Sequence, residues 1–211
     1  MSCSTLQILT IFEKLAETVN QNEQYLNELD SFIGDAEHGL NMKRAFTIIL
    51  DKLDSFKEYE PAEAVKRVGT VLAGAGCGSG PIFYGLAIRA AGSSFVKNGM
   101  NSADEVAQGL EAALQAIKEK GGADVGYKTM VDAFDPAVKA FRTQVDQGAT
   151  VVQAFEAAVS AAEVGMKATT DMVGKKGRSF HAGERGTGHQ DPGATSCFLL
   201  LKSICETISN F

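Results

Sequence analysis

The chain has 211 residues, of which 45% are hydrophobic and 22% charged, enough apolar material for one domain (1–211) to bury a substantial core. The formal net charge of -6 at pH 7 excludes broad binding to the phosphate backbone of DNA or RNA, which requires clustered Lys and Arg. No apolar run is long enough to span a bilayer, and the first residues lack the basic region of a signal peptide, so a membrane protein or an exported protein is not expected.

Apolar residues recur at helical spacing along nearly the whole chain, whereas strand-like alternation is almost absent. The pattern therefore predicts an all-α protein with eight helices, near 4–28, 40–55, 61–74, 81–97, 102–120, 128–146, 149–172 and 192–210. Ser102 and Glu105 have the spacing of a capping box at the start of the fifth helix. Pro136 falls inside the sixth helix and predicts either a kink or a later start there.

Glycines and cysteines give two further indications. Seventeen of the 22 glycines lie in four clusters, 34–39, 69–85, 121–126 and 174–193, and each cluster adjoins a predicted helix end. Glycine lets backbone N–H groups approach a ligand, so the four loops are predicted to converge on one ligand, although glycine also commonly ends helices. The four cysteines form no CxxC pair, which fits a reduced cytoplasmic setting.

The segment LNELDSFIGDAEHGLNM carries the first candidate site. Asp30, Asp35 and Glu37 lie within eight residues and directly precede a helix start. Hard carboxylate oxygens suit Mg²⁺, which usually binds through one or two carboxylates, waters and the phosphates of a substrate. The free N–H groups of the following helix would favour a phosphate beside the metal. Helix capping by the two aspartates and a solvated Glu37 is the alternative interpretation.

The segment GAGCGSGPIFYG resembles a phosphate-binding loop in its physics only. Gly78, Ser79 and Gly80 precede Pro81 and an apolar helix, so backbone N–H groups would be free at a helix start. The segment lacks the GK[ST] ending of a Walker A loop, and its glycines miss the GxGxxG spacing, which argues against a P-loop or Rossmann protein. The Ser79 hydroxyl is expected to donate to a phosphate or to cap the helix.

The segment GKKGRSFHAGERGTGHQDPGATS has the composition of a loop that closes over a ligand. Arg178 could pair with a phosphate through its planar guanidinium, and the alternative is an exposed cation. His181 and His189 could act in acid–base chemistry, although loop histidines are more often ordinary polar contacts. Nothing in the segment has the spacing of zinc ligands.

Taken together, these motifs resemble a known family. IGDAEHGLNM is similar to its IGDxDHGxNM motif, GSGP to its xSGP loop, KTMVD to its KTMxD stretch and GHQDPGATS to its last nucleotide-binding motif. The family is that of the ADP-binding L subunit of bacterial dihydroxyacetone kinase (DhaL), and the resemblance covers essentially the whole chain. It implies a closed barrel of eight amphipathic antiparallel helices, with the nucleotide and two Mg²⁺ ions at one end.

The resemblance also implies site residues, position by position. The metal-binding carboxylates fall on Asp30, Asp35 and Glu37. The nucleotide contacts fall on His38, Asn41, Gly78, Ser79, Gly121, Met130, Arg178, Asp191 and Gly193. Met130 would touch the base, whereas without the KTM match it would be taken for a core residue. The chain departs from the family in having Glu37 for Asp and Cys77 for Gly.

The implied activity is transfer of the terminal phosphoryl group of a bound magnesium nucleotide to dihydroxyacetone. A partner K subunit would hold the dihydroxyacetone, and a phosphorylated M subunit would recharge the bound ADP. Phosphoryl transfer rewards positioning and charge neutralisation, so Arg178 is assigned to phosphate stabilisation and no residue to general acid–base catalysis. Neither nucleic acid nor membrane is an expected partner, and the sequence leaves formation of a homodimer open.

Three other interpretations stay open at this stage. An ATP-exchanging subunit of a related short-ketose kinase would keep the same metal site. A non-catalytic nucleotide-binding regulator would keep the loops but need no K subunit. A purely structural helical module would make the three motifs coincidental.

Overall fold

The computed structural model describes residues 3–211, and these residues form α-helices and short 3₁₀-helices without a strand. The ten α-helices are α1 (Thr5–Gln21), α2 (Glu23–Ser31), α3 (His38–Leu50), α4 (Pro61–Ala73), α5 (Ser79–Asn98), α6 (Ala103–Gly121), α7 (Val131–Asp146), α8 (Val151–Ala168), α9 (Gly177–Ala182) and α10 (Pro192–Ile208). The 3₁₀-helices are η1 (Leu53–Phe56), η2 (Thr169–Asp171) and η3 (Gly183–Gly186). The prediction of an all-α protein is confirmed, but the predicted count of eight helices is wrong.

Two differences account for the higher count. The predicted helix 4–28 is broken at Asn22, whose N–H is shared between the carbonyls of Thr18 (3.2 Å) and Val19 (3.3 Å) before α2 begins. Apolar spacing continues from Val19 to Leu26 across the break, so periodicity gave no sign of it. In addition, the segment expected to be only a loop, 174–193, contains the short helix α9 and the 3₁₀-helix η3.

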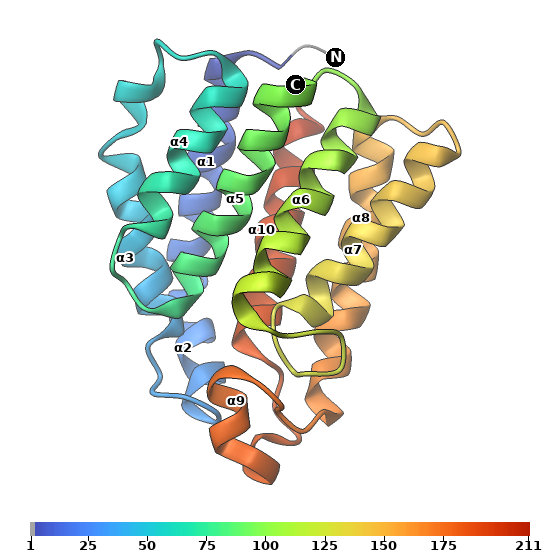
Figure 1. Cartoon of the computed structure of the whole chain (residues 1–211). Helices are drawn as coiled ribbons and strands as arrows, with labels where there is room; N and C mark the ends of the chain where they lie inside the picture. The colour runs from blue at the N-terminus through green and yellow to red at the C-terminus, as the bar shows by residue number, and fades with distance from the viewer. Residues whose placement is uncertain (1–2) are drawn as a thin grey trace.

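Eight of the helices form a closed ring. Each of these helices contacts the next in the order α1, α3, α4, α5, α6, α7, α8 and α10. Helix α10 contacts α1 again, which closes the ring. Successive helices of the ring alternate in direction, while α2 and α9 lie at the end of the ring where α3, α5, α7 and α10 begin (Figure 1). The loops that carry the sequence motifs therefore meet at this end.

The apolar faces of the ring helices turn inward because each helix is amphipathic. Phe12, Phe46, Phe141 and Leu72 are among the residues buried in the core. The ring also encloses an apolar cavity of about 580 Å³, lined by residues of all eight ring helices. In residues 3–211 no helix combines the length and the hydropathy that crossing a membrane requires.

Close contact between α4 and α5 depends on glycines inside both helices. A Cβ atom on Gly69 would lie 2.2 Å from the backbone N of Arg89, and one on Gly85 would lie 2.1 Å from the backbone N of Ala73. Both glycines lie inside helices, as the predicted helices 61–74 and 81–97 have them, and not in the loop of their cluster. They allow two helix backbones to approach more closely than a side chain would permit.

Helix α7 begins at Val131 and continues through Pro136, so the alternative of a later start at this proline is wrong. A proline in this position cannot donate a hydrogen bond to the carbonyl of Asp132, four residues earlier. That carbonyl faces Gly165 of α8, where an added Cβ would lie 2.0 Å from its oxygen. The glycine thus makes room for a carbonyl that the proline leaves without its helical partner.

Candidate functional site

The loop between α2 and α3 brings two of the predicted metal ligands together. Asp30, at the end of α2, is 3% exposed and accepts hydrogen bonds from the backbone N–H groups of Glu37 (3.0 Å) and His38 (3.2 Å). Burial is the main cause that raises the pKa of Asp30, and the adjacent Asp35 carboxyl adds to it. A Cβ on Gly34 would lie 2.2 Å from Asp30 Oδ1, so the glycine lets the loop wrap around this carboxylate.

Asp35 also pairs with a cation. Its Oδ2 lies 2.5 Å from Nη1 of Arg178 in α9. Although desolvation opposes the effect, this guanidinium keeps the pKa of Asp35 below its usual range. The side chain of Glu37 is exposed and does not line the cavity that Asp30 and Asp35 share. Across residues 3–211, no three acidic, histidine or cysteine side chains gather closely enough to hold a metal ion by themselves.

His38 is the first residue of α3, and its side chain belongs to a row of three polar side chains. Its Nε2 lies 2.9 Å from the hydroxyl of Ser196, which in turn lies 2.7 Å from the hydroxyl of Tyr84. Desolvation, with a smaller contribution from the charge of Arg178, lowers the pKa of His38 to about 4. The imidazole is therefore neutral at pH 7 and can serve as a hydrogen-bond partner, but it contributes no positive charge to a phosphate site.

The predicted phosphate loop ends at the N-terminus of the 20-residue helix α5. Gly78 has φ 80° and ψ -179°, a conformation that is essentially restricted to glycine. A Cβ at this position would also lie 2.9 Å from the side-chain nitrogen of Asn41. Ser79 is the first helical residue and makes no side-chain cap, which removes helix capping as its role and leaves its hydroxyl free to face the cavity.

The opposite side of the cavity is formed by the end of α6 and the start of α7. Gly121 and Met130 both line it, and Met130 is 8% exposed. Phe83, Ile117 and Ala123 line the same side, although the sequence had not pointed to them. The aromatic ring of Phe83, the aliphatic side chains of Ile117 and Ala123 and the thioether of Met130 form an apolar surface. Such a surface is suited to the flat face of a nucleotide base.

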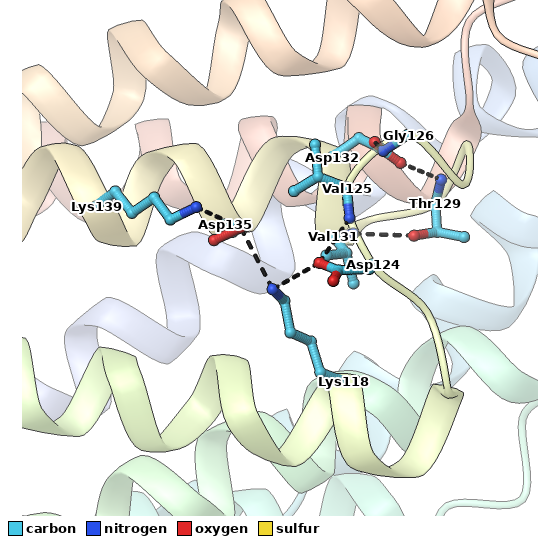
Figure 2. Close-up of polar contacts among 9 residues, drawn as sticks. All are labelled: Lys118, Asp124, Val125, Gly126, Thr129, Val131, Asp132, Asp135 and Lys139. Atoms are coloured by element: carbon cyan, nitrogen blue, oxygen red, sulfur yellow. Dashed lines mark hydrogen bonds and ion pairs between the residues drawn. The ribbon is translucent and has the colours of Figure 1, made fainter.

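The loop that presents Met130 is shaped by a buried carboxylate (Figure 2). Asp132, which is 2% exposed, accepts hydrogen bonds from the backbone N–H groups of Gly126 (2.5 Å) and Thr129 (2.8 Å). On the outer side, Nζ of Lys118 bridges Asp124 (2.8 Å) and Asp135 (3.3 Å), which ties α6 to the loop and to α7. Asp132, the last residue of the KTMVD stretch, therefore stabilises the loop and does not line the cavity.

Helix α10 starts at the cavity with Asp191 as its N-cap. Asp191 is 6% exposed, and its Oδ2 accepts a hydrogen bond from the backbone N–H of Ala194 at 2.7 Å. Burial raises the pKa of Asp191 to about 7, against the opposing effects of the Ala194 hydrogen bond and the nearby ammonium of Lys128. Asp191 and Gly193, two of the expected nucleotide contacts, both line the cavity.

The segment 174–193, called the lid below, forms part of the cavity wall. Lys176, Gly177, Arg178 and Ser179 of this segment line the cavity. The two histidines of the lid are not part of the cavity wall. Instead, the ring of His189 stacks on Phe32 with 3.8 Å between ring centroids and 8° between ring planes. The stack joins the far end of the lid to the end of α2.

Most of the predicted site residues thus surround one cavity of about 210 Å³. Those that line it are Asp30, Asp35, His38, Asn41, Ser79, Gly121, Met130, Arg178, Asp191 and Gly193. Gly78 does not line the cavity but lies against Asn41, which does, and Glu37 contributes only its backbone N–H to Asp30. The arrangement places two carboxylates, a helix N-terminus and a guanidinium at one side and an apolar slot at the other.

Comparison with known proteins gives the same assignment. Residues 32–206 match the model of the family described as DAK2 domain. The chain is 36% identical over 205 residues to the ADP-binding subunit DhaL of the PEP-dependent dihydroxyacetone kinase of Escherichia coli, with 97% of each chain covered. It is 32% identical over 197 residues to the DhaL subunit of the PTS-dependent enzyme of Lactococcus lactis, covering 93% of this chain and 94% of the relative.

Solved structures agree in fold. The native dihydroxyacetone kinase of C. freundii superimposes with a TM-score of 0.73 and 27% sequence identity, over 98% of this chain and 35% of that chain. A second structure of the C. freundii enzyme, in complex with AMP-PNP and Mg²⁺, gives a TM-score of 0.70 and 25% identity. The chain thus spans about a third of the C. freundii kinase.

Proposed function

The chain belongs to the DAK2 domain family, and we propose that it is the ADP-binding, DhaL-type subunit of a dihydroxyacetone kinase that depends on phosphoenolpyruvate. In this proposal the single domain 1–211 works in the cytoplasm with a K subunit that holds dihydroxyacetone and a phosphorylated M subunit that recharges the ADP. The observation that carries it is the shared cavity, in which Asp30 and Asp35, the end of the phosphate loop, the base-contacting residues and Arg178 meet.

The residues present fit a magnesium nucleotide. Asp30 and Asp35 place two carboxyl groups in direct contact, one of them buried, and a divalent cation would relieve the repulsion between them. Two carboxylates are also the usual protein contribution to a Mg²⁺ site, the remaining ligands being waters and phosphate oxygens. Glu37, whose side chain is exposed outside the cavity but whose backbone N–H is bonded to Asp30, would become the third ligand by turning its carboxylate toward the bound metal.

The nucleotide, when bound with its magnesium ions, supplies the phosphoryl group that is transferred. The work of this chain is to position it and to neutralise its charge. The N-terminus of α5, at Gly78 and Ser79, offers backbone N–H groups to phosphate oxygens, and the helix dipole favours their negative charge. Arg178 adds a guanidinium from the lid, which also keeps water away from the reacting phosphate.

One further candidate function has support among the relatives. The chain is 32% identical over 212 residues to the L-erythrulose 1-kinase of Mycolicibacterium smegmatis, of which it covers 35%. An ATP-exchanging subunit for a related short ketose would use the same cavity. The dihydroxyacetone assignment is preferred because relatives matched along almost their whole length are named as DhaL subunits.

The deciding experiment combines the purified chain with labelled ATP and a K subunit, with and without a phosphorylated M subunit, and follows formation of dihydroxyacetone phosphate. We expect product only when the phosphorylated M subunit is present, with ADP staying bound to the chain. Rapid product formation from ATP alone, with ADP released at each turnover, would favour the ATP-exchanging function. Failure of both mixtures, with nucleotide still bound, would favour a regulator.

The metal site is tested separately by Asp35→Asn. The substitution removes a charge from the cavity but none from the core, so the helical circular dichroism signal should persist while magnesium-dependent ADP binding is lost. Asp124→Asn is the matched control, because Asp124 lies outside the cavity and pairs with Lys118. Calorimetric ADP affinity equal to that of the wild type in Asp35→Asn would remove Asp35 from the metal site.

A further inference from the structure

Lys128 is a buried cation that the proposed chemistry leaves without a role. We propose that Lys128 is a positioning residue that fastens both ends of the lid and thereby holds Arg178 over the nucleotide. The inference rests on the proposed function in one respect, which is that ADP is the ligand beneath the lid. The contacts between Lys128 and the lid do not depend on which ligand is bound.

The side chain of Lys128 bridges the two flanks of the lid. It is 0% exposed, and its Nζ donates hydrogen bonds to the carbonyl oxygens of Thr169 (2.5 Å) and His189 (2.6 Å). Thr169 lies in η2, shortly before the lid begins, whereas His189 lies near the end of the lid. A single ammonium group therefore closes a loop of about 20 residues by contacts to backbone atoms, which hold the chain path independently of side-chain identity.

The backbone around Lys128 holds the middle and the beginning of the lid. The carbonyl of Lys128 accepts a hydrogen bond from the hydroxyl of Ser179 in α9 (3.0 Å). The carbonyl of Tyr127 accepts one from the backbone N–H of Lys175 (3.1 Å). Lys128 itself has φ 59°, in the left-handed region that non-glycine residues rarely adopt. This costly conformation directs its side chain and its carbonyl toward different parts of the lid.

Lys128 acts through these carbonyls rather than through a carboxylate. Within residues 3–211 it forms no ion pair at hydrogen-bond distance, although the more distant charges of Asp191, Asp132 and Asp171 oppose the lowering of its pKa by burial. Its position is central, because Arg178 lies between the two fastened flanks and makes the lid's ion pair with Asp35. Loss of the ammonium would release the flanks and, through them, Arg178.

The test replaces Lys128 with methionine, which keeps the length of the side chain but donates no hydrogen bond. Lys139→Met is the matched control, since Lys139 is an exposed lysine of α7 with 75% side-chain exposure. The lid itself contains Lys175, Lys176, Arg178 and Arg185, so trypsin reports on its opening in the absence of any nucleotide. Release of a fluorescent ADP analogue gives the second measurement.

We expect Lys128→Met to accelerate tryptic cleavage within the lid and to speed release of the ADP analogue on the order of tenfold, whereas Lys139→Met changes neither. If Lys128 acts through Arg178, the effect on release should largely disappear when Arg178→Ala is already present. Effects of Lys128→Met and Arg178→Ala that simply add, or a lid that stays as resistant to trypsin as in the wild type, would overturn the proposal.

Two outcomes separate this inference from the proposed function and from misfolding. A wild-type chain that binds no ADP would defeat the proposed function, while the cleavage result without nucleotide would still decide whether Lys128 fastens the lid. If Lys128→Met does not fold, Ser179→Ala tests the backbone part of the same connection, because it removes the hydrogen bond from α9 to the Lys128 carbonyl together with a local bond to the carbonyl of Lys176. Unchanged cleavage and unchanged ADP release in Ser179→Ala would then count against the clamp.

Discussion

Asp191 combines two properties at one residue, since it caps α10 and lines the nucleotide cavity. Because burial raises its pKa to about 7 from the ordinary 3.8, the folded protein holds a proton on Asp191 at pH values where the unfolded chain has lost it. Folding is therefore favoured by this group at low pH, and the contribution declines as the pH rises. A salt-bridged carboxylate has the opposite pH dependence, because its contribution to the free energy of unfolding rises with pH.

The first prediction follows from this ionisation. Between about pH 4 and pH 7, the free energy of unfolding of Asp191→Asn should fall less with rising pH than that of the wild type. The difference amounts to roughly 4 kcal/mol at most, at about 1.4 kcal/mol per pKa unit. Asparagine is as good an N-cap as aspartate, so the helix start is retained. Urea unfolding of both proteins across this pH range measures the effect, and parallel curves would contradict it.

The second prediction concerns Gly78 in the phosphate loop. Gly78→Ala should weaken ADP binding by at least about tenfold, because alanine is strained at this φ and its Cβ would press on the Asn41 side chain. Gly76→Ala is the matched control, since Gly76 also has positive φ (69°) but no atom within 4 Å of its added Cβ. Calorimetry should show the larger loss for Gly78→Ala, and equal losses would remove the Asn41 contact from the explanation.

Single residues were predictable from the sequence where a motif fixed their chemistry. The motifs allowed Asp30, Asp35 and Arg178 to be proposed, although helix capping and an exposed cation were open alternatives, and the structure brings all three into one cavity. Lys128 could not be recognised as buried, because a lysine that follows the glycine-rich segment 121–126 looks like an exposed cation. Its burial depends on carbonyls from Thr169 and His189, residues that are distant in sequence.

At the scale of helices, α4 and α5 make the most extensive contact among the described ring helices, through Gly69, Gly85 and Gly92. A Cβ on Gly92 would lie 2.4 Å from the backbone N of Lys66, so the close approach continues along the length of both helices. Since α5 also carries the phosphate loop at its N-terminus, the spacing between these helices sets the position of that loop relative to the rest of the cavity.

The third prediction tests this packing. Gly85→Ala should lower the free energy of unfolding by roughly 3 kcal/mol, because the added methyl group would force the backbone of Ala73 away. Ser93→Ala, an exposed position on the same helix, should change stability little. Urea unfolding followed by circular dichroism measures both. A Gly85→Ala protein as stable as the wild type would show that the helices can separate at little cost.

Helices were predictable where caps and apolar spacing agreed. Both hydrogen bonds of the capping box between Ser102 and Glu105 are formed, and α6 begins at Ala103, directly after Ser102. The break at Asn22 escaped prediction because the apolar stripe carries on through it and neither glycine nor proline marks it. Helix α9 escaped prediction because its six residues, which begin with Gly177, give too short a pattern, and tertiary contacts such as that of Ser179 hold it.

At the scale of the whole molecule, the nucleotide cavity shares a wall with the apolar cavity inside the ring. Ile117 and Met130 line both the nucleotide cavity and the larger apolar cavity inside the ring. The base-contacting side of the site therefore rests on side chains that are also part of the interior. The resemblance implied the barrel and the end at which the site lies, but neither the size of the interior cavity nor this shared wall could be derived from apolar spacing.

In the closed ring every helix contacts a neighbour on both sides, so no helix is the first or the last in space. Helix α1 contacts α10, and the start of α1 and the end of α10 lie at the same end of the ring, away from the lid (Figure 1). A circular permutant should therefore be tolerated, with residues 3 and 211 joined by a flexible linker and new ends between Gly148 and Ala149, in an exposed turn. As a fourth prediction, we expect this permutant to bind ADP with nearly wild-type affinity in calorimetry, because the permutation leaves every cavity residue on an intact helix or loop. A permutant that folds but no longer binds ADP would show that the order of helices along the chain, and not only their order in space, sets the geometry of the site.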